Sequence, residues 1–274
     1  MKILEVQNLT VQTGDGSKVV SDVSFSVEPG ERLGIIGESG SGKSMTALAV
    51  IGLLPAELKA SGSLLLGNGK DALMQILGAA EKDLNKIRGT VASIVFQEPL
   101  TALDPLMKIG RQLSEPLRRW HGLKGYALQD AIISALAEVR INKPERIAAS
   151  YPYEISGGER QRAAIAMALA CKPSLLIADE PTTALDVTVQ AEILTLLDTI
   201  VSNRGMSLLF ISHDLAVVSR ITDHVLVMKD GSIVESGSLR DILRTPKHPY
   251  TRDLVTSAKE LDNALDIAKK SGGN

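Results

Sequence analysis

The chain carries two kinds of hydrophobic pattern, one after the other. Residues 2–27 alternate apolar and polar side chains around a turn at 13–17, which predicts two half-buried strands. Later apolar runs are short and uninterrupted, as is typical of strands that are buried on both faces of a parallel sheet. These runs lie at 32–36, 91–96, 174–178 and 207–211.

Helical periodicity fills the intervals between these runs. Between 98 and 150 the pattern is helical, with 129–140 the clearest amphipathic stretch. A last hairpin is expected over 225–235 around Asp230-Gly231. Further helices are expected at 45–54, 159–170, 187–200 and 215–221. This order of elements predicts an α/β core into which a helical block is inserted.

Composition and charge exclude several classes of protein. No apolar run reaches the roughly 20 residues needed to span a bilayer, so we expect contact with a membrane only through a partner. Lys and Arg number 30 against 32 Asp and Glu, which gives no electrostatic reason to expect nucleic acid as a partner. Cys171 is the single cysteine, which excludes intrachain disulfides and favours a reducing, cytoplasmic setting.

A phosphate-binding loop follows the strand expected at 32–36. The segment GESGSGKS (37–44) matches G-x-x-x-x-G-K-[ST] and has the strand before it and the helix after it that this motif requires. Its glycines let backbone N–H groups turn toward the phosphates, with Lys43 reaching the β- and γ-phosphates and Ser44 reaching Mg²⁺. The expected ATP-binding residues are Gly37, Glu38, Ser39, Gly40, Ser41, Gly42, Lys43, Ser44 and Met45.

Polar side chains end two of the later apolar strands. Asp179 and Glu180 follow one strand, and His213 follows the next one along the chain. In an open parallel sheet, ligands bind outside the carboxyl ends of the strands, so these side chains belong beside the phosphate loop. We expect Asp179 to hold Mg²⁺, Glu180 to polarise the attacking water, and His213 to contact the γ-phosphate.

Gln97 ends the strand at 91–96 and precedes the helical block. From there its amide can reach both Mg²⁺ and the water, and it can transmit the state of the nucleotide to the helices. We therefore count Gln97 with Glu180 and His213 as catalytic, and with Ser44 and Asp179 as a Mg²⁺ ligand. The alternative is a polar residue that only caps the strand.

A second anion site opens the helix expected at 159–170. Ser156, Gly157, Gly158 and Glu159 place a hydroxyl and two glycine N–H groups at its start. The phosphate loop already holds the chain's own ATP, so this site is expected to face the ATP of another molecule. That predicts a head-to-tail dimer in which ATP lies between Lys43 of one chain and Ser156 of its partner. The alternative is an ordinary helix cap.

In order and spacing, these motifs resemble the ATP-binding subunits of ABC transporters. The segments that carry the resemblance are the phosphate loop, Gln97, ISGGERQ (155–161), LLIADE (175–180), TALD (183–186) and His213. It implies an α/β fold, a P-loop NTPase (RecA-like) core with an N-terminal antiparallel β-subdomain and an inserted α-helical subdomain. It also implies that 184–186 touches the dimer partner and that the segment after Gln97 receives a helix of a membrane subunit.

The resemblance places the domain limits as well. Residues 1–256 form the nucleotide-binding domain, with a core at 1–97 and 163–240 and a helical subdomain at about 98–162. Residues 257–274 form a polar tail.

A narrower resemblance points to the peptide and nickel importers. FQEPLTALDP (96–105), YPYEISGGERQR (151–162) and HPYTRDLV (248–255) look like that subfamily. It implies an ATPase subunit that energises uptake of di- or oligopeptides from the cytoplasmic face of the inner membrane. The implied partners are a second, non-identical ATPase subunit, two transmembrane permease subunits and an extracytoplasmic solute-binding protein.

Two departures from the family pattern leave alternatives open. Residues 7–24 contain no aromatic side chain to stack on adenine, which leaves that contact to Val11, Val19 or Val20. The chain ends at Asn274 without the tail cysteines of many peptide importers, which resembles the nickel and metallophore members. Nickel or metal-chelator import is therefore the alternative function, followed by an exporter ATPase or an ABC ATPase outside transport.

Overall fold

The first of two β-sheets is built from the N-terminal part of the chain. The computed structural model describes residues 2–97, 102–183 and 185–259. Four antiparallel strands lie in the order β2-β1-β4-β5. They are β1 (Leu4–Gln12), β2 (Lys18–Val27), β4 (Lys59–Leu66) and β5 (Met74–Gln75). The two strands expected over 2–27 and the turn between them are confirmed.

The second sheet has six strands in the order β10-β9-β3-β8-β7-β6. Five of them are parallel, and β10 is antiparallel at one edge. Their bounds are β3 (Arg32–Ile36), β6 (Ala92–Val95), β7 (Leu175–Asp179), β8 (Ser207–Ser212), β9 (His224–Lys229) and β10 (Ser232–Ser238). Asp230 and Gly231 turn the β9–β10 hairpin with φ of 48° and 80°, the backbone that this dipeptide favours. The expected hairpin is confirmed.

Each strand in the middle of the second sheet contributes to two hydrophobic cores. Leu209 and Ile211 of β8 face the first sheet and α1 (Lys43–Val50). Leu208 and Phe210 face the opposite way, toward the other helices. Because both faces are covered, most positions of these strands are apolar, which explains the uninterrupted runs in the sequence.

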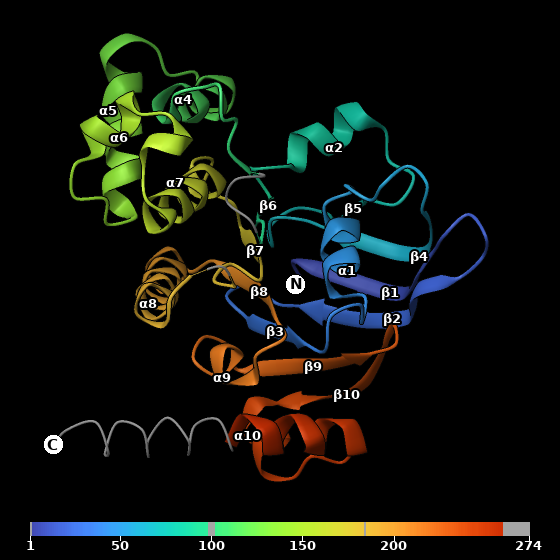
Figure 1. The fold of residues 1–274 in the computed structure, drawn as a ribbon. Coiled ribbons are helices and arrows are strands. Elements are labelled where there is room, and N and C mark those ends of the chain that lie inside the picture. The colour runs from blue at the N-terminus through green and yellow to red at the C-terminus, as the bar shows by residue number, and fades with distance from the viewer. Residues whose placement is uncertain (1, 98–101, 184, 260–274) are drawn as a thin grey trace, which may run out of the picture.

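Regular structure is purely helical between 102 and 174 in the described chain. Figure 1 shows α4, α5 and α6 gathered in one group beside the end of β6, with α7 leading back to the sheet. The helices are α4 (Ile109–His121), α5 (Gly125–Glu138), α6 (Pro144–Ala149) and α7 (Gly157–Leu169), with a 3₁₀ turn at Pro152–Glu154. The predicted helical block is therefore confirmed.

The remaining helices cover the sheets, and several differ in length from the prediction. They are α2 (Glu81–Ile87), α8 (Val187–Arg204), α9 (Leu215–Val218), α10 (Leu239–Arg244) and a helical stretch at 249–259. α1 ends at Val50 rather than at 54, since Gly52 takes a left-handed φ of 64° that stops the helix. α8 runs to Arg204, where Gly205 ends it in the same way. Among the described residues, we find no helix with the length and hydrophobicity that crossing a bilayer requires.

Candidate functional site

The phosphate loop connects β3 to α1 and depends on glycine at two points. A Cβ on Gly37 would lie 2.2 Å from the carbonyl oxygen of Met228. Gly42 precedes α1 with a left-handed φ of 95°, and a Cβ there would lie 2.7 Å from the carbonyl oxygen of Val19. No side chain caps the start of α1, so the N–H groups of its first turn remain available to an anion.

Lys43 is folded back onto this loop. Its side chain is buried, and its Nζ donates to the carbonyl oxygens of Gly37 and Glu38, each at 2.7 Å. Burial lowers the pKa of Lys43, while the carboxylates of Glu180, Asp179 and Glu38 act in the opposite direction. Lys43 Nζ also donates to Ser41 Oγ at 3.4 Å. An ammonium held by neutral oxygen atoms in a confined site is well placed to turn toward a phosphate.

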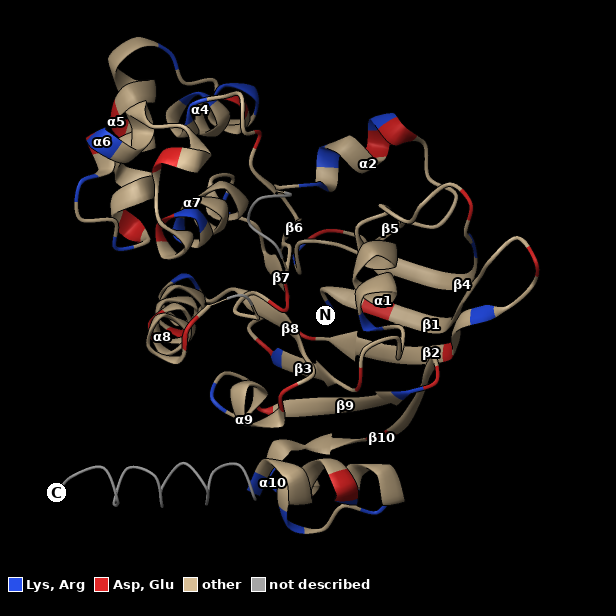
Figure 2. Cartoon of the chain, viewed as in Figure 1, with Lys and Arg blue, Asp and Glu red and all other residues tan. Residues whose placement is uncertain are grey.

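Asp179 and Ser44 bring two oxygen donors together at the end of β7. Ser44 Oγ donates to Asp179 Oδ1 at 3.1 Å, and Asp179 is 6% exposed. Burial raises the pKa of Asp179, against the Ser44 hydrogen bond and the charge of Lys43. Figure 2 shows acidic residues in red just after β7, next to the start of α1. A hydroxyl oxygen and a carboxylate whose burial as a charged group costs free energy form a donor set that suits Mg²⁺.

Glu180 lies at the centre of a second polar cluster. Its carboxylate accepts from Gln97 Nε2 at 3.2 Å, and its Oε1 lies 3.1 Å from His213 Nδ1. The sheet register explains the meeting, since Asp179 pairs with Ile211, which places Glu180 and His213 at the same edge. Glu180 also takes a left-handed φ of 46°, and such strain in a non-glycine residue often accompanies function.

Thr183 is a site residue that the sequence reasoning missed. Its Oγ1 donates to Glu180 Oε2 at 2.8 Å, so the carboxylate has a third polar neighbour. The only signal in the sequence is its position three residues after Glu180, where a turn returns the hydroxyl to the carboxylate. Ala184, in the loop expected to touch a partner, lies outside the described residues, as does the segment 98–101 after Gln97.

Most of the predicted residues line one recess of about 620 Å³. Of the three valines considered for adenine, Val19 lines the recess, whereas Val11 and Val20 are buried in the core. The predicted residues that line the recess are Glu38, Ser39, Gly40, Gly42, Lys43, Ser44, Met45, Gln97, Glu180 and His213. Asp179 joins them through Ser44.

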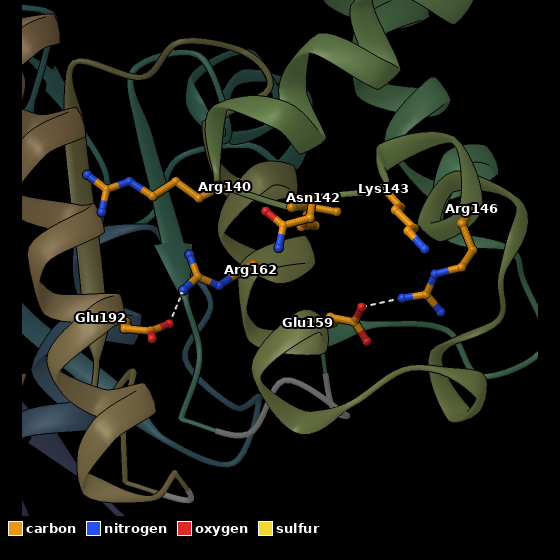
Figure 3. A pocket seen from close by; sticks show the side chains of 8 residues that line it. Arg140, Asn142, Lys143, Arg146, Glu159, Arg162 and Glu192 are labelled. Carbon is orange, nitrogen blue, oxygen red and sulfur yellow. Dashed lines mark hydrogen bonds and ion pairs between the residues drawn. The ribbon is translucent and has the colours of Figure 1, made fainter.

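The start of α7 lies apart from this recess. Ser156 Oγ accepts from the N–H of Glu159 at 3.2 Å, and Glu159 Oε2 accepts from the N–H of Ser156 at 2.9 Å. Glu159 lines a different recess of about 700 Å³, where it pairs with Arg146 of α6 (Figure 3). Residues 156–158 line neither of these two recesses. The structure therefore does not bring α7 to the chain's own phosphate loop.

Comparison with known proteins identifies the family. The model of the ABC transporter family matches residues 20–183. The chain belongs to the ABC transporter family. Like other ATPases of this family, it binds and hydrolyses ATP.

Relatives and solved structures agree with this assignment. A protein of Brucella ovis, named for peptide import and ATP binding, is 45% identical over 92% of this chain and 75% of its own length. The oligopeptide transport ATP-binding protein OppD of Escherichia coli is 45% identical over 95% of this chain and 77% of its own. The dimeric ATP-binding cassette MJ0796, bound to ADP and Pi in a post-hydrolysis state, superimposes with a TM-score of 0.75 and 27% identity. That alignment covers 86% of this chain and 99% of the cassette.

Proposed function

We propose that this ABC ATPase energises the uptake of peptides through membrane subunits supplied by other chains. The observation that carries the proposal is 45% identity, over almost the whole chain, to two proteins named for peptide or oligopeptide transport. The geometry of the ATP site supports ATP hydrolysis. It does not identify the solute, because solute contacts would lie on the partner subunits.

ATP binding is assigned to the recess around the phosphate loop. Backbone N–H groups of 38–45 would surround the phosphates, and Lys43 would leave the carbonyls of Gly37 and Glu38 for the β- and γ-phosphate oxygens. Ser44 and Asp179, joined by Gln97, would hold Mg²⁺, which supplies positive charge beside the phosphates when bound. Val19 offers an apolar surface to the adenine in place of an aromatic ring.

Hydrolysis is assigned to the cluster around Glu180. Its carboxylate would accept a proton as water attacks the γ-phosphorus and the bond to ADP breaks. Gln97, Thr183 and His213 already contact this carboxylate and would fix its direction. His213 would also approach the γ-phosphate as the water is positioned.

The start of α7 is assigned to the ATP of a partner in a head-to-tail dimer. Ser156 Oγ accepts an N–H from its own helix but keeps its proton, which it can donate to a phosphate oxygen. Among the residues that the structure describes, a Cβ on Gly157 would meet nothing within 4 Å, so their contacts do not explain the glycine. Close approach by a phosphate of another chain would explain it, and MJ0796 was solved as a dimer with ADP and Pi.

The assembly and the domain limits remain part of this proposal. We expect a second, non-identical ATPase, two permease subunits and an extracytoplasmic binding protein, with this chain on the cytoplasmic face of the inner membrane. Within a nucleotide-binding domain at 1–256, the helical subdomain at 98–162 would separate the core at 1–97 from that at 163–240. Because α7 continues across residue 162, that subdomain and the core are joined by one rigid helix.

Reconstitution tests the function directly. The chain is co-expressed with the genes that neighbour its own, and the resulting complex is reconstituted in lipid vesicles. ATP turnover is then measured with a library of di- and oligopeptides. We expect peptides to stimulate turnover when the binding protein is present. Stimulation by nickel or a metal chelate, with none by peptides, would replace peptide import by the metal alternative. Turnover without any of these partners or solutes would argue for an ATPase outside transport.

A further inference from the structure

One tyrosine connects the segment after α10 to the phosphate loop. Tyr250 lies in the helical stretch 249–259, is 6% exposed, and accepts a hydrogen bond from the N–H of Glu38 at 2.9 Å. The segment HPYT (248–251) contributed to the resemblance, but the sequence assigned no role to its side chains. Residues 212 positions apart in the chain are joined by this contact.

The peptide group between Gly37 and Glu38 is held from both sides. The carbonyl oxygen of Gly37 accepts from Lys43 Nζ at 2.7 Å, while the N–H of Glu38 donates to the Tyr250 hydroxyl. Because the C=O and N–H of a trans peptide point in opposite directions, these two bonds fix the peptide plane. Once Lys43 turns to the phosphates, the hydrogen bond from the N–H of Glu38 to Tyr250 still restrains this peptide group.

Tyr250 is itself held through β9, which pairs with β3, and through β10, the next strand beyond β9. Lys229 Nζ of β9 lies 4.9 Å from the centroid of the Tyr250 ring. The carboxylate of Glu235 in β10 accepts from the N–H groups of Lys247 and His248 at 2.8 and 2.9 Å. Burial raises the pKa of Tyr250, so the phenol keeps its proton at neutral pH. The hydroxyl therefore has a fixed place relative to the strand that leads into the loop.

We propose that Tyr250 is a positioning residue of the ATP site. It orients the first peptide of the phosphate loop so that the following N–H groups keep their direction toward the phosphates. The proposal rests on ATP binding at this loop and extends the nucleotide site to the segment after α10. Tyr250 acts through Glu38 and is not assigned any contact with the nucleotide.

Tyr250→Phe tests this role because it removes the hydroxyl and keeps the ring beneath Lys229. Loss of a hydrogen bond of about 1 kcal/mol corresponds to an approximately fivefold loss of affinity. We expect the Kd of the full chain for ADP, and the KM for ATP in the assembled transporter, to rise by that factor. The kcat should stay within about twofold, since the hydrolytic groups are untouched. The matched control is Tyr126→Phe on α5, where Tyr126 is 91% exposed, and it should change neither constant.

Amide exchange followed by NMR gives a second test, which starts from the wild-type chain. In the nucleotide-free wild-type chain, the N–H of Glu38 should exchange more slowly than that of Ser39, and Tyr250→Phe should abolish this difference. Equal exchange of the two amides in the wild type would overturn the proposal. So would a Tyr250→Phe chain that melts at a lower temperature but keeps its Kd and KM, because Tyr250 would then serve packing alone. A wild-type chain that binds no ADP would overturn the ATP site itself.

Discussion

Two helices of this ABC ATPase begin at loops rich in glycine and serine, and their first turns differ. The N-cap residue of α1 is Gly42, which has no side chain to cap the helix. The N-cap residue of α7 is Ser156, and Ser156 and Glu159 cap each other's N–H groups. The first turn of α1 is therefore incomplete without an anion, whereas that of α7 is complete as an ordinary helix and still presents a hydroxyl proton.

The glycines at the starts of α1 and α7 also differ in the space that a side chain would have. A side chain at Gly42 would collide with the backbone of Val19, so the chain's own fold requires glycine there. A side chain at Gly157 would meet none of the described residues within 4 Å. This difference is why we assign the start of α1 to the chain's own ATP and the start of α7 to a ligand from outside the chain.

The largest effect is expected beside α1, from Glu180→Gln. An amide fits the same contacts but cannot accept the proton of the attacking water. Turnover of the assembled complex should fall by about 10³-fold, while the Kd for ADP stays unchanged. ATP-dependent dimers should also persist on size-exclusion chromatography. If turnover stays within about tenfold of the wild type, the proton acceptor is a different group.

Ser156→Arg should produce the next largest effect, at the start of α7. The long side chain would fill the place assigned to the partner's γ-phosphate, and hydrolysis in the complex should fall by about 10²-fold. Binding of ADP to the variant chain alone should be unaffected, because its own phosphate loop is intact. Ser134→Arg, an equivalent change at an exposed site on α5, is the control. Full hydrolysis in the Ser156→Arg complex would show that α7 does not meet a nucleotide.

Gly157→Ala separates a ligand role of α7 from a structural one. No described residue opposes a Cβ at 157, and alanine favours helix more than glycine does, so the melting temperature should be equal or higher. Hydrolysis in the complex should nevertheless fall about tenfold, because the methyl group displaces the partner's phosphate. Gly14→Ala, at another position with open space, should leave both properties unchanged. Normal hydrolysis by the Gly157→Ala complex would show that Gly157 only starts the helix and does not contact the partner's nucleotide.

The smallest effect is expected where Glu235 of β10 anchors the segment that precedes Tyr250. Burial raises the pKa of Glu235, but hydrogen bonds from the N–H groups of Lys247 and His248 act in the opposite direction, and the pKa lies below 4.5. A carboxylate with a lowered folded-state pKa stabilises the fold above its unfolded pKa, and this stability is lost as the pH falls through the folded value. Glu235→Gln should therefore melt about 2 °C lower than the wild type at pH 7, with the gap closing below pH 4.5. A gap that stays constant down to pH 3 would exclude the charge of Glu235 as its cause.

The sequence predicted the members of the α1 site more readily than their surroundings. The phosphate loop, Asp179 and Glu180 could be proposed because each is a local motif attached to a strand whose apolar pattern is clear, and the structure brings them together. Thr183 and Tyr250 were missed because their partners are set by a turn and by a distant contact, which have no periodic signature. The end of α1 was placed four residues too far, since Gly52 was read as part of a continuing apolar helix.

By itself, the sequence determined the strands and helices around the ATP site, the two helix starts and the family, because these depend on short-range patterns of polarity and on residues adjacent in the chain. It did not predict β4, β5, α2 or α10. Only the tertiary structure decided which side chains meet. The register of β7 against β8 brings His213 to Glu180, and the return of the chain after β10 brings Tyr250 to Glu38. Such contacts depend on how sheets and helices pack, and the local sequence around each residue does not indicate which distant residue it will contact.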